Sequence, residues 1–255
     1  MIASTEAVIL TSMRYGDTSK IVTAYTRQFG KLSVIAKGAA GAKSKFGAAL
    51  EPLCHCQLVL YKKESRDLHL LSQADAICSF RGIQEHPDKL MPGFAMVEFV
   101  HAAVHGEEEH EELYRLLLDG LSRLESVSRN PVSVLLRFLL DFTGAMGFSI
   151  DLEHCLHCRA DLRAEESVQG RVTFSAPEGS FTCSACALAV SGTSVSAVAF
   201  KGLQWLSTAG GDTLGLLGMP AHGAHESVRI LHQYIASHIQ GMRKIHSLDL
   251  LDQLS

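Results

Sequence analysis

The chain has little of what marks a membrane or secreted protein. No run of eighteen apolar residues occurs among its 255 residues, because Arg137 and Asp141 interrupt the most apolar stretch, residues 134–142. The N-terminus has no basic region followed by an apolar core, so no signal peptide is expected. The seven cysteines are an odd number, which does not suit a framework of paired disulfides. These absences predict a protein of a reducing cytoplasm, with no membrane partner.

Motifs that carry common kinds of catalysis are also missing. The sequence contains no glycine-rich phosphate loop and no nucleophile elbow. Zinc deaminases hold their metal with three protein ligands and carry Pro directly before a Cys-x-x-Cys pair. Neither Cys-x-x-Cys pair of this chain has Pro before it. We therefore expect no catalytic residues and no small-molecule substrate, and keep a zinc hydrolase or deaminase as an alternative.

Negative charge exceeds positive charge overall, but the excess is unevenly distributed. The formal net charge is −4, from 23 Lys and Arg against 27 Asp and Glu. Residues 1–80 hold ten basic and six acidic residues, a net +4, whereas residues 81–255 hold 13 basic and 21 acidic residues, a net −8. Such a split predicts a basic working surface on the N-terminal part of an otherwise acidic protein.

Four of the seven cysteines form two Cys-x-x-Cys pairs. Cys155 and Cys158 are separated by 24 residues from Cys183 and Cys186. Two intervening residues let one tight turn aim both sulfurs at one ion, and a second such turn completes a tetrahedron. The segment between the pairs suits a small β-ribbon, with a strand at residues 171–175 and a turn at residues 178–180. The spacing predicts one Zn²⁺ ion held by these four cysteines.

Other interpretations of the cysteine pairs are weaker. Two disulfides need an oxidising compartment, and a thioredoxin-like pair stands alone at the start of a helix. His154 and His157 could replace one sulfur, but four thiolates already close the coordination shell. A closed shell leaves no position for water, so we expect a structural and not a catalytic zinc.

The first 80 residues are predicted to form a β-barrel. Strand-like stretches with β-branched residues and alternating polarity occupy residues 3–13, 19–28, 32–37, 56–62 and 67–80. Five short strands joined by turns favour a small Greek-key barrel of the OB type, with an SH3-like barrel as the alternative. Cys54 and Cys56 are expected to be core thiols of this barrel.

Helical periodicity replaces strand alternation after Pro87. Helices are predicted at residues 93–105, 112–127, 132–146, 196–209 and 226–242. The acidic run at residues 106–112 is interpreted as a solvated loop and helix start. The expected class is therefore α+β, with an OB domain at 1–80, a helical domain at 81–150 and 191–255, and a zinc-binding lobe at 151–190.

The predicted barrel carries cations and aromatic residues suited to single-stranded nucleic acid. OB barrels bind single strands with a basic groove for the backbone and aromatic platforms for the bases. The candidate cations are Arg14, Lys20, Arg27, Lys31, Lys37, Lys43 and Lys45, and the candidate platforms are Tyr15, Phe29 and Phe46. Lys43 and Lys45 are favoured because their Gly- and Ala-rich loop lets the chain approach a phosphate closely. A protein–protein adaptor without DNA contact stays open as the rival class.

Several of these stretches resemble the RecO family of bacterial recombination and repair mediators. The resemblance is carried by Arg14-Tyr-Gly-Asp-Thr-Ser19, Thr26-Arg-Gln-Phe-Gly-Lys31, Ala36-Lys-Gly-Ala39, Phe46-Gly-Ala-Ala-Leu-Glu-Pro52, both cysteine pairs and, more weakly, Lys244-Ile-His-Ser-Leu248. Arg159 departs from the pattern, because the family commonly has Gly after the first cysteine pair.

The resemblance implies a protein without enzymatic activity. It implies binding and annealing of single-stranded DNA, with binding of duplex DNA left open. It also implies action with RecR to help RecA replace the single-stranded-DNA-binding protein. That last protein ends in an acidic tail with a terminal Phe, which needs cations and an apolar pocket. The candidate cations for the tail are Arg115, Arg123, Arg129 and Arg137.

Overall fold

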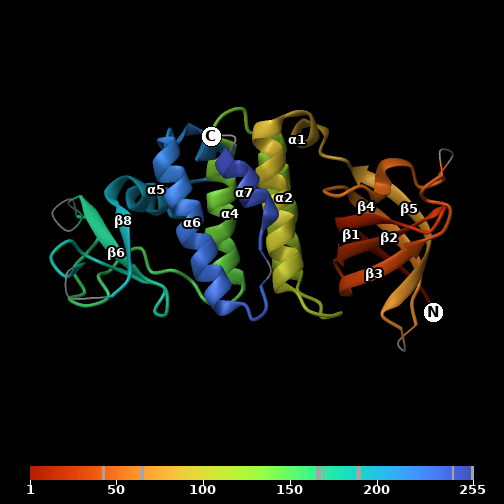
Figure 1. The fold of residues 1–255 in the computed structure, drawn as a ribbon, viewed down its shortest axis with the longest axis horizontal. Coiled ribbons are helices and arrows are strands. Elements are labelled where there is room, and N and C mark those ends of the chain that lie inside the picture. The colour runs from red at the N-terminus through yellow and green to blue at the C-terminus, as the bar shows by residue number, and fades with distance from the viewer. Residues whose placement is uncertain are drawn as a thin grey trace. The chain divides into compact units, whose positions relative to one another are not determined.

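The computed structural model describes residues 1–41, 44–63, 66–164, 168, 170–187, 191–242 and 244–253. It divides into two compact units, unit 1 at Met1–Glu125 and unit 2 at Ser126–Ser255 (Figure 1). The finer division into parts at 1–80, 81–150, 151–190 and 191–255 stays a prediction. Among the described residues, no helix is both long and apolar enough to span a lipid bilayer.

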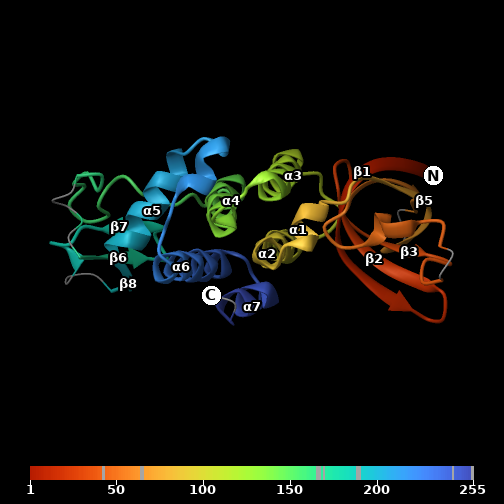
Figure 2. The same ribbon diagram turned by 90° about the horizontal axis from the view of Figure 1, so that it is seen from above.

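Unit 1 begins with a closed five-stranded barrel, seen from above in Figure 2. Its strands pair in the order β1-β2-β3-β5-β4, with β3 and β5 parallel and the remaining pairs antiparallel. This Greek-key order confirms the OB-type barrel. The predicted strands are confirmed to within two residues at each end. They are β1 Ile2–Tyr15, β2 Ser19–Thr26, β3 Gly30–Ala36, β4 His55–Tyr61 and β5 Leu68–Cys78.

Alternation along the strands fills the barrel interior. Val22, Ala24 and Val34 are completely buried, as expected of side chains that point to one face of a sheet. The 3-10 helix η1, Gly47–Leu50, adds Leu50 to the same core. Cys54 and Cys56 are completely buried, which confirms them as core thiols, and burial raises the pKa of the Cys54 thiol to about 11.

Three helices complete unit 1: α1 Arg81–Glu85, α2 Pro87–Ala103 and α3 Glu111–Ser126. The helix predicted at residues 93–105 begins earlier because Pro87 occupies its first turn, where a missing N–H costs nothing. The Glu125 carboxylate accepts hydrogen bonds from Gly82 N and Ile83 N at 3.0 and 2.8 Å, which satisfies free amides at the start of α1.

Unit 2 combines helices with a small sheet. Its helices are α4 Pro131–Ala145, α5 Ala197–Thr208, α6 Ala221–His238 and α7 His246–Gln253, with the 3-10 helix η4 at Gly211–Leu216. The sheet has the order β7-β6-β8, with β6 Arg171–Ser175, β7 Ser180–Thr182 and β8 Thr193–Ser196. The prediction missed β8 and α7, which are too short to show a clear period.

Aromatic packing ties this sheet to the helices of unit 2. Phe174 and Phe181 lie against each other with ring centroids 4.8 Å apart, and Phe181 lies 4.7 Å from Phe200 of α5. The Tyr234 hydroxyl of α6 donates to Phe148 O at 2.9 Å. Gly179 in the β6–β7 turn has φ +56° and lies so close to Tyr234 that a Cβ there would be 2.2 Å from its hydroxyl oxygen. Only glycine suits both this φ and this contact.

Candidate metal centre and nucleic-acid interface

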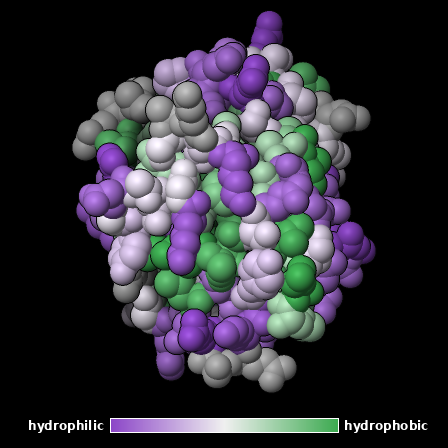
Figure 3. Space-filling view, turned by 90° about the vertical axis from the view of Figure 1, so that its right-hand side faces the viewer, coloured by the Kyte–Doolittle hydropathy of each residue, from purple (hydrophilic) through white to green (hydrophobic). Residues whose placement is uncertain are grey.

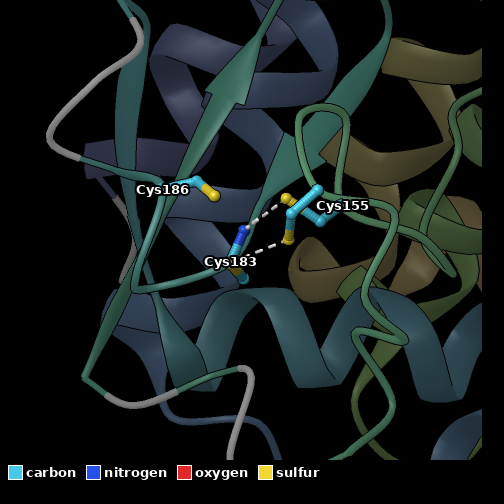
Figure 4. A group of neighbouring side chains, drawn as sticks. Cys155, Cys183 and Cys186 are labelled. Carbon is cyan, nitrogen blue, oxygen red and sulfur yellow. Dashed lines mark hydrogen bonds between the residues drawn. The ribbon is translucent and has the colours of Figure 1, made fainter.

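The four predicted ligand cysteines come together at the edge of the small sheet. The Sγ atoms of Cys155, Cys158, Cys183 and Cys186 all lie within 4.8 Å of one another, and Cys158 and Cys183 are 3.7 Å apart. Zn–S bonds of about 2.3 Å in a tetrahedron place sulfurs about 3.8 Å apart, so the cluster has the size of one ion's shell. Figure 4 shows labelled cysteines from both loops pointing toward one another.

Backbone amides prepare the sulfur of Cys155 to carry negative charge. Cys183 N donates to Cys155 Sγ at 3.3 Å. Burial alone would raise the pKa of the Cys155 thiol, but hydrogen bonds from the amides of Cys158, Cys183 and His157 lower that pKa to about 6. Amide donors of this kind stabilise a thiolate, which is the form that binds a metal.

Arg159 marks the departure from the family pattern and has a clear structural consequence. Its φ is +61°, a left-handed conformation that glycine adopts without penalty and that costs other residues energy. Its amide donates to Cys155 O at 3.0 Å, so the turn around the first cysteine pair is kept in spite of the side chain. The guanidinium is exposed and lies 3.9 Å from Asp151 Oδ2.

The outer surface of the barrel carries a continuous row of apolar side chains. Ile2 pairs with Tyr61, Tyr61 with Leu70, Leu70 with Ile35, Ile35 with Ile21, and Ile21 with Met13. Directly paired residues share one face of a sheet, so these six residues form an apolar row across all five strands. Ile2 and Met13 are 66% and 61% exposed. On the face of the molecule drawn in Figure 3, patches of apolar side chains lie among polar ones.

The sequence contained a signal for the apolar row that the prediction did not use. In β2, β3 and β5 an apolar residue on the core face is directly next in sequence to an apolar residue on the outer face: Val22 to Ile21, Val34 to Ile35, and Leu71 to Leu70. A strand with only one face in a core would alternate apolar and polar residues. Apolar residues on both faces therefore indicate a second contact surface.

Some predicted DNA-binding residues are exposed. Lys37, directly after β3, is exposed and makes no ion pair within the described residues. Arg14 and Tyr15 at the end of β1 are also exposed, with Tyr15 at 55%. Lys45 is exposed and donates to Ser72 O at 2.7 Å. Lys43 lies outside the described residues.

Other predicted DNA-binding residues are engaged within unit 1. Lys20 pairs with Glu51 at 2.7 Å, Arg27 pairs with Glu111 at 2.7 Å, and Lys31 Nζ donates to His101 O at 2.7 Å. Phe29 is half-buried, and Lys62 Nζ lies 5.5 Å from the centre of its ring. Phe46 packs into the barrel core and is only 4% exposed, so its ring is closed to bases.

The four arginines predicted for the tail site divide between the units. Arg115 and Arg123 lie on α3, where Arg115 pairs with Glu111 at 2.7 Å. Arg137 on α4 donates to Asp141 and to the carbonyls of Leu206 and Ala209. Arg129 is exposed, and its carbonyl lies beside Gly215 in η4.

Comparison with known proteins covers nearly the whole chain. The family model described as "Recombination protein O N terminal" matches residues 1–80, and the one described as "Recombination protein O C terminal" matches residues 84–249. The chain is 29% identical over 258 residues to the "DNA repair protein RecO" of Chloroherpeton thalassium, covering 100% of this chain and 99% of that protein. It is 42% identical over 123 residues to the protein of that name from Salinibacter ruber, covering 48% of this chain and 47% of that protein.

An OB-type barrel followed by a helical domain with a four-thiol cluster is thus the architecture of a DNA repair and recombination protein. The two family models, which match residues 1–80 and 84–249, together identify the family. The chain belongs to the RecO family.

Proposed function

We propose that this protein binds single-stranded DNA on the outer face of its barrel and acts as a recombination mediator without catalytic activity. The observation that carries the proposal is the apolar row, with the exposed Lys37 directly beyond Ile35 and the exposed Arg14 and Tyr15 beside Met13. Unpaired bases can lie on apolar and aromatic side chains while cations contact the phosphates. Base faces are apolar whatever the sequence, so binding should be independent of sequence.

Binding of one oligonucleotide as a single strand and as a duplex tests this proposal. Duplex DNA offers the phosphates of both strands but keeps its base faces stacked away from the apolar row. We expect about tenfold or greater preference for the single strand, since stacking contributes roughly 1–3 kcal/mol per base. Fluorescence anisotropy of a labelled strand would measure both affinities. Equal affinities for single-stranded and duplex DNA would mean that the apolar row is not part of the interface and that only phosphates are contacted.

We further infer that the protein anneals complementary strands and, with RecR, helps load RecA onto DNA coated by single-stranded-DNA-binding protein. This part is supported by membership of the RecO family. An assay of RecA assembly on coated DNA checks it. If the protein and RecR together gave no acceleration over RecA alone, the mediator role would be contradicted.

We infer that the metal is one structural Zn²⁺ ion bound by Cys155, Cys158, Cys183 and Cys186. Four sulfur donors and no open position are typical of structural zinc sites. The ion would cross-link the two loops that carry the cysteine pairs, which supports a role in folding and not in chemistry.

For the acidic tail of single-stranded-DNA-binding protein, we propose a site at Arg129 in unit 2. Gly215 lies against the Arg129 carbonyl, and the next residue, Leu216, is 75% exposed. An exposed cation on a segment whose backbone adjoins an exposed apolar residue suits a carboxylate next to a Phe ring. Replacing Arg129 by Ala should weaken binding of a tail peptide about fivefold or more, whereas replacing the exposed Arg229 of α6 should not. Equal binding by both variants and the parent would place the site elsewhere.

A further inference from the structure

The acidic run that was predicted as a solvated loop lies against the barrel of unit 1. We call residues 106–111, which follow α2 and include the first residue of α3, the acidic strap. Lys31 N donates to Gly106 O at 3.1 Å, and the Tyr25 hydroxyl donates to His110 O at 3.2 Å. Gly30 has φ +59°, and a Cβ there would be 2.3 Å from Glu108 O. The backbone of the strap is therefore in direct contact with the β2–β3 turn.

Glu107 of the acidic strap occupies a polar position at the barrel edge. Its carboxylate lies 2.5 Å from Lys62 Nζ and 2.9 Å from His69 Nε2. The side chains of Lys62 and His69 are only 13% and 1% exposed. Burial alone would raise the pKa of Glu107, but the hydrogen bonds from Lys62 and His69 lower it, so the carboxylate carries its charge at neutral pH.

Glu111 makes the second contact between the strap and a barrel cation. Its Oε1 accepts from Arg27 Nε at 3.2 Å and from Arg27 Nη2 at 2.7 Å. Hydrogen bonds from Arg27 and Arg115 lower the pKa of Glu111. The guanidinium donors of arginine suit carboxylate and phosphate oxygens alike, so Glu111 occupies donors that a DNA phosphate would use.

The strap contacts selected residues and is not merely near a basic surface. Glu109 and Glu112 are exposed and make no ion pair within the described part of the chain. Glu107 instead meets Lys62, whose Nζ lies 5.5 Å from the centre of the Phe29 ring, and Glu111 meets Arg27, two residues before Phe29. Phe29 and the two cations together have the composition of a single-strand site, an aromatic ring with positive charges.

We propose that the acidic strap is an intramolecular competitor of DNA, with Glu107 and Glu111 holding Lys62 and Arg27 in place of phosphates. The idea rests on the proposed binding of single-stranded DNA by the barrel. DNA that reaches the β2–β3 turn displaces the strap and gains two cations and the Phe29 ring. The strap thereby lowers the affinity of the protein for short or weakly held DNA strands. While the strap is in place, DNA can contact only the outer face of the barrel.

The test compares two double variants with the same change in charge. Glu107→Gln/Glu111→Gln removes the competing carboxylates, and Glu109→Gln/Glu112→Gln is the matched control. We expect the first variant to bind a single-stranded oligonucleotide roughly threefold to tenfold more tightly than the control. Its plot of log K against log salt should be steeper by about 1.4, because each phosphate contact contributes about 0.7 on single strands.

Equal affinity and slope in the two variants would overturn the competition while leaving DNA binding intact. A parent protein that bound no single-stranded DNA would overturn the proposed function and this inference together. If the first variant did not fold, hydrogen exchange of the parent would decide the question. DNA should speed exchange within the strap, at residues 106–111, and at the Lys31 amide, which donates to Gly106 O. Unchanged or slower exchange there would contradict displacement.

Discussion

Replacing Cys183 by Ser is expected to abolish metal binding and to unfold the lobe around β6 and β7. Three ligands remain after the change, and a structural zinc site of this kind contributes roughly 10 kcal/mol or more to folding. The lobe has little to replace that contribution. Its strands are five, three and four residues long, and its core consists of a few side chains such as Val172, Phe174 and Phe181.

Metal analysis and hydrogen exchange would measure this result. The parent, prepared without chelator, should hold one zinc per chain, and Cys183→Ser should hold none and exchange rapidly in the strands β6 and β7. Cys78→Ser is the matched control, because Cys78 is a half-buried cysteine outside the cluster. It should keep the zinc and the slow exchange. A Cys183→Ser variant with full zinc content, or a parent without zinc, would show that the cluster is not a structural zinc site.

Replacing Lys43 and Lys45 together by Ala is expected to weaken binding of single-stranded DNA roughly tenfold to a hundredfold near physiological salt. The loop from Gly38 to Gly47 is rich in Gly and Ala, and Lys45 within it is exposed. Each lost phosphate contact also lowers the dependence on salt, by about 0.7 unit of slope on single strands. The slope should therefore become less steep by about 1.4 units for the two lost contacts.

A matched control is available in unit 2. Lys201 on α5 and Lys244 before α7 are exposed, and replacing both by Ala removes the same charge from surface positions outside the barrel. That variant should bind like the parent if the effect depends on position and not on net charge. Equal losses in both variants would mean that overall charge alone governs binding, and an unchanged slope in the Lys43/Lys45 variant would remove the loop from the interface.

Local sequence patterns predicted much of this fold. Alternation and turn residues located all five strands of the barrel, and the spacing of the cysteines located the four-thiol cluster. Apolar periodicity located α3 and α4 to within one residue at each end. These features depend on neighbours in the chain, so a single sequence contains the information that defines them.

Pairing between distant residues could not be predicted in the same way. Arg27 pairs with Glu111 and Lys62 pairs with Glu107. Both glutamates come after the helices α1 and α2, far from the barrel cations in the sequence. A run of acids has the same local pattern whether it is solvated or ion-paired, and only the docked backbone at Gly30 separates the two cases. Likewise, burial of the Phe46 ring depends on the closing of the barrel and not on its neighbours in sequence.

The salt dependence of single-strand binding by the parent protein tests the central claim most directly. Equilibrium binding of an unstructured oligonucleotide would be measured from about 50 to 300 mM monovalent salt. With several phosphates neutralised by the barrel cations, log K should fall linearly with log salt, with a slope of roughly −2 to −4. Oligonucleotides of different base sequence should give similar values. A slope near zero, or no measurable binding at low salt, would contradict a DNA-binding barrel and favour a protein–protein adaptor.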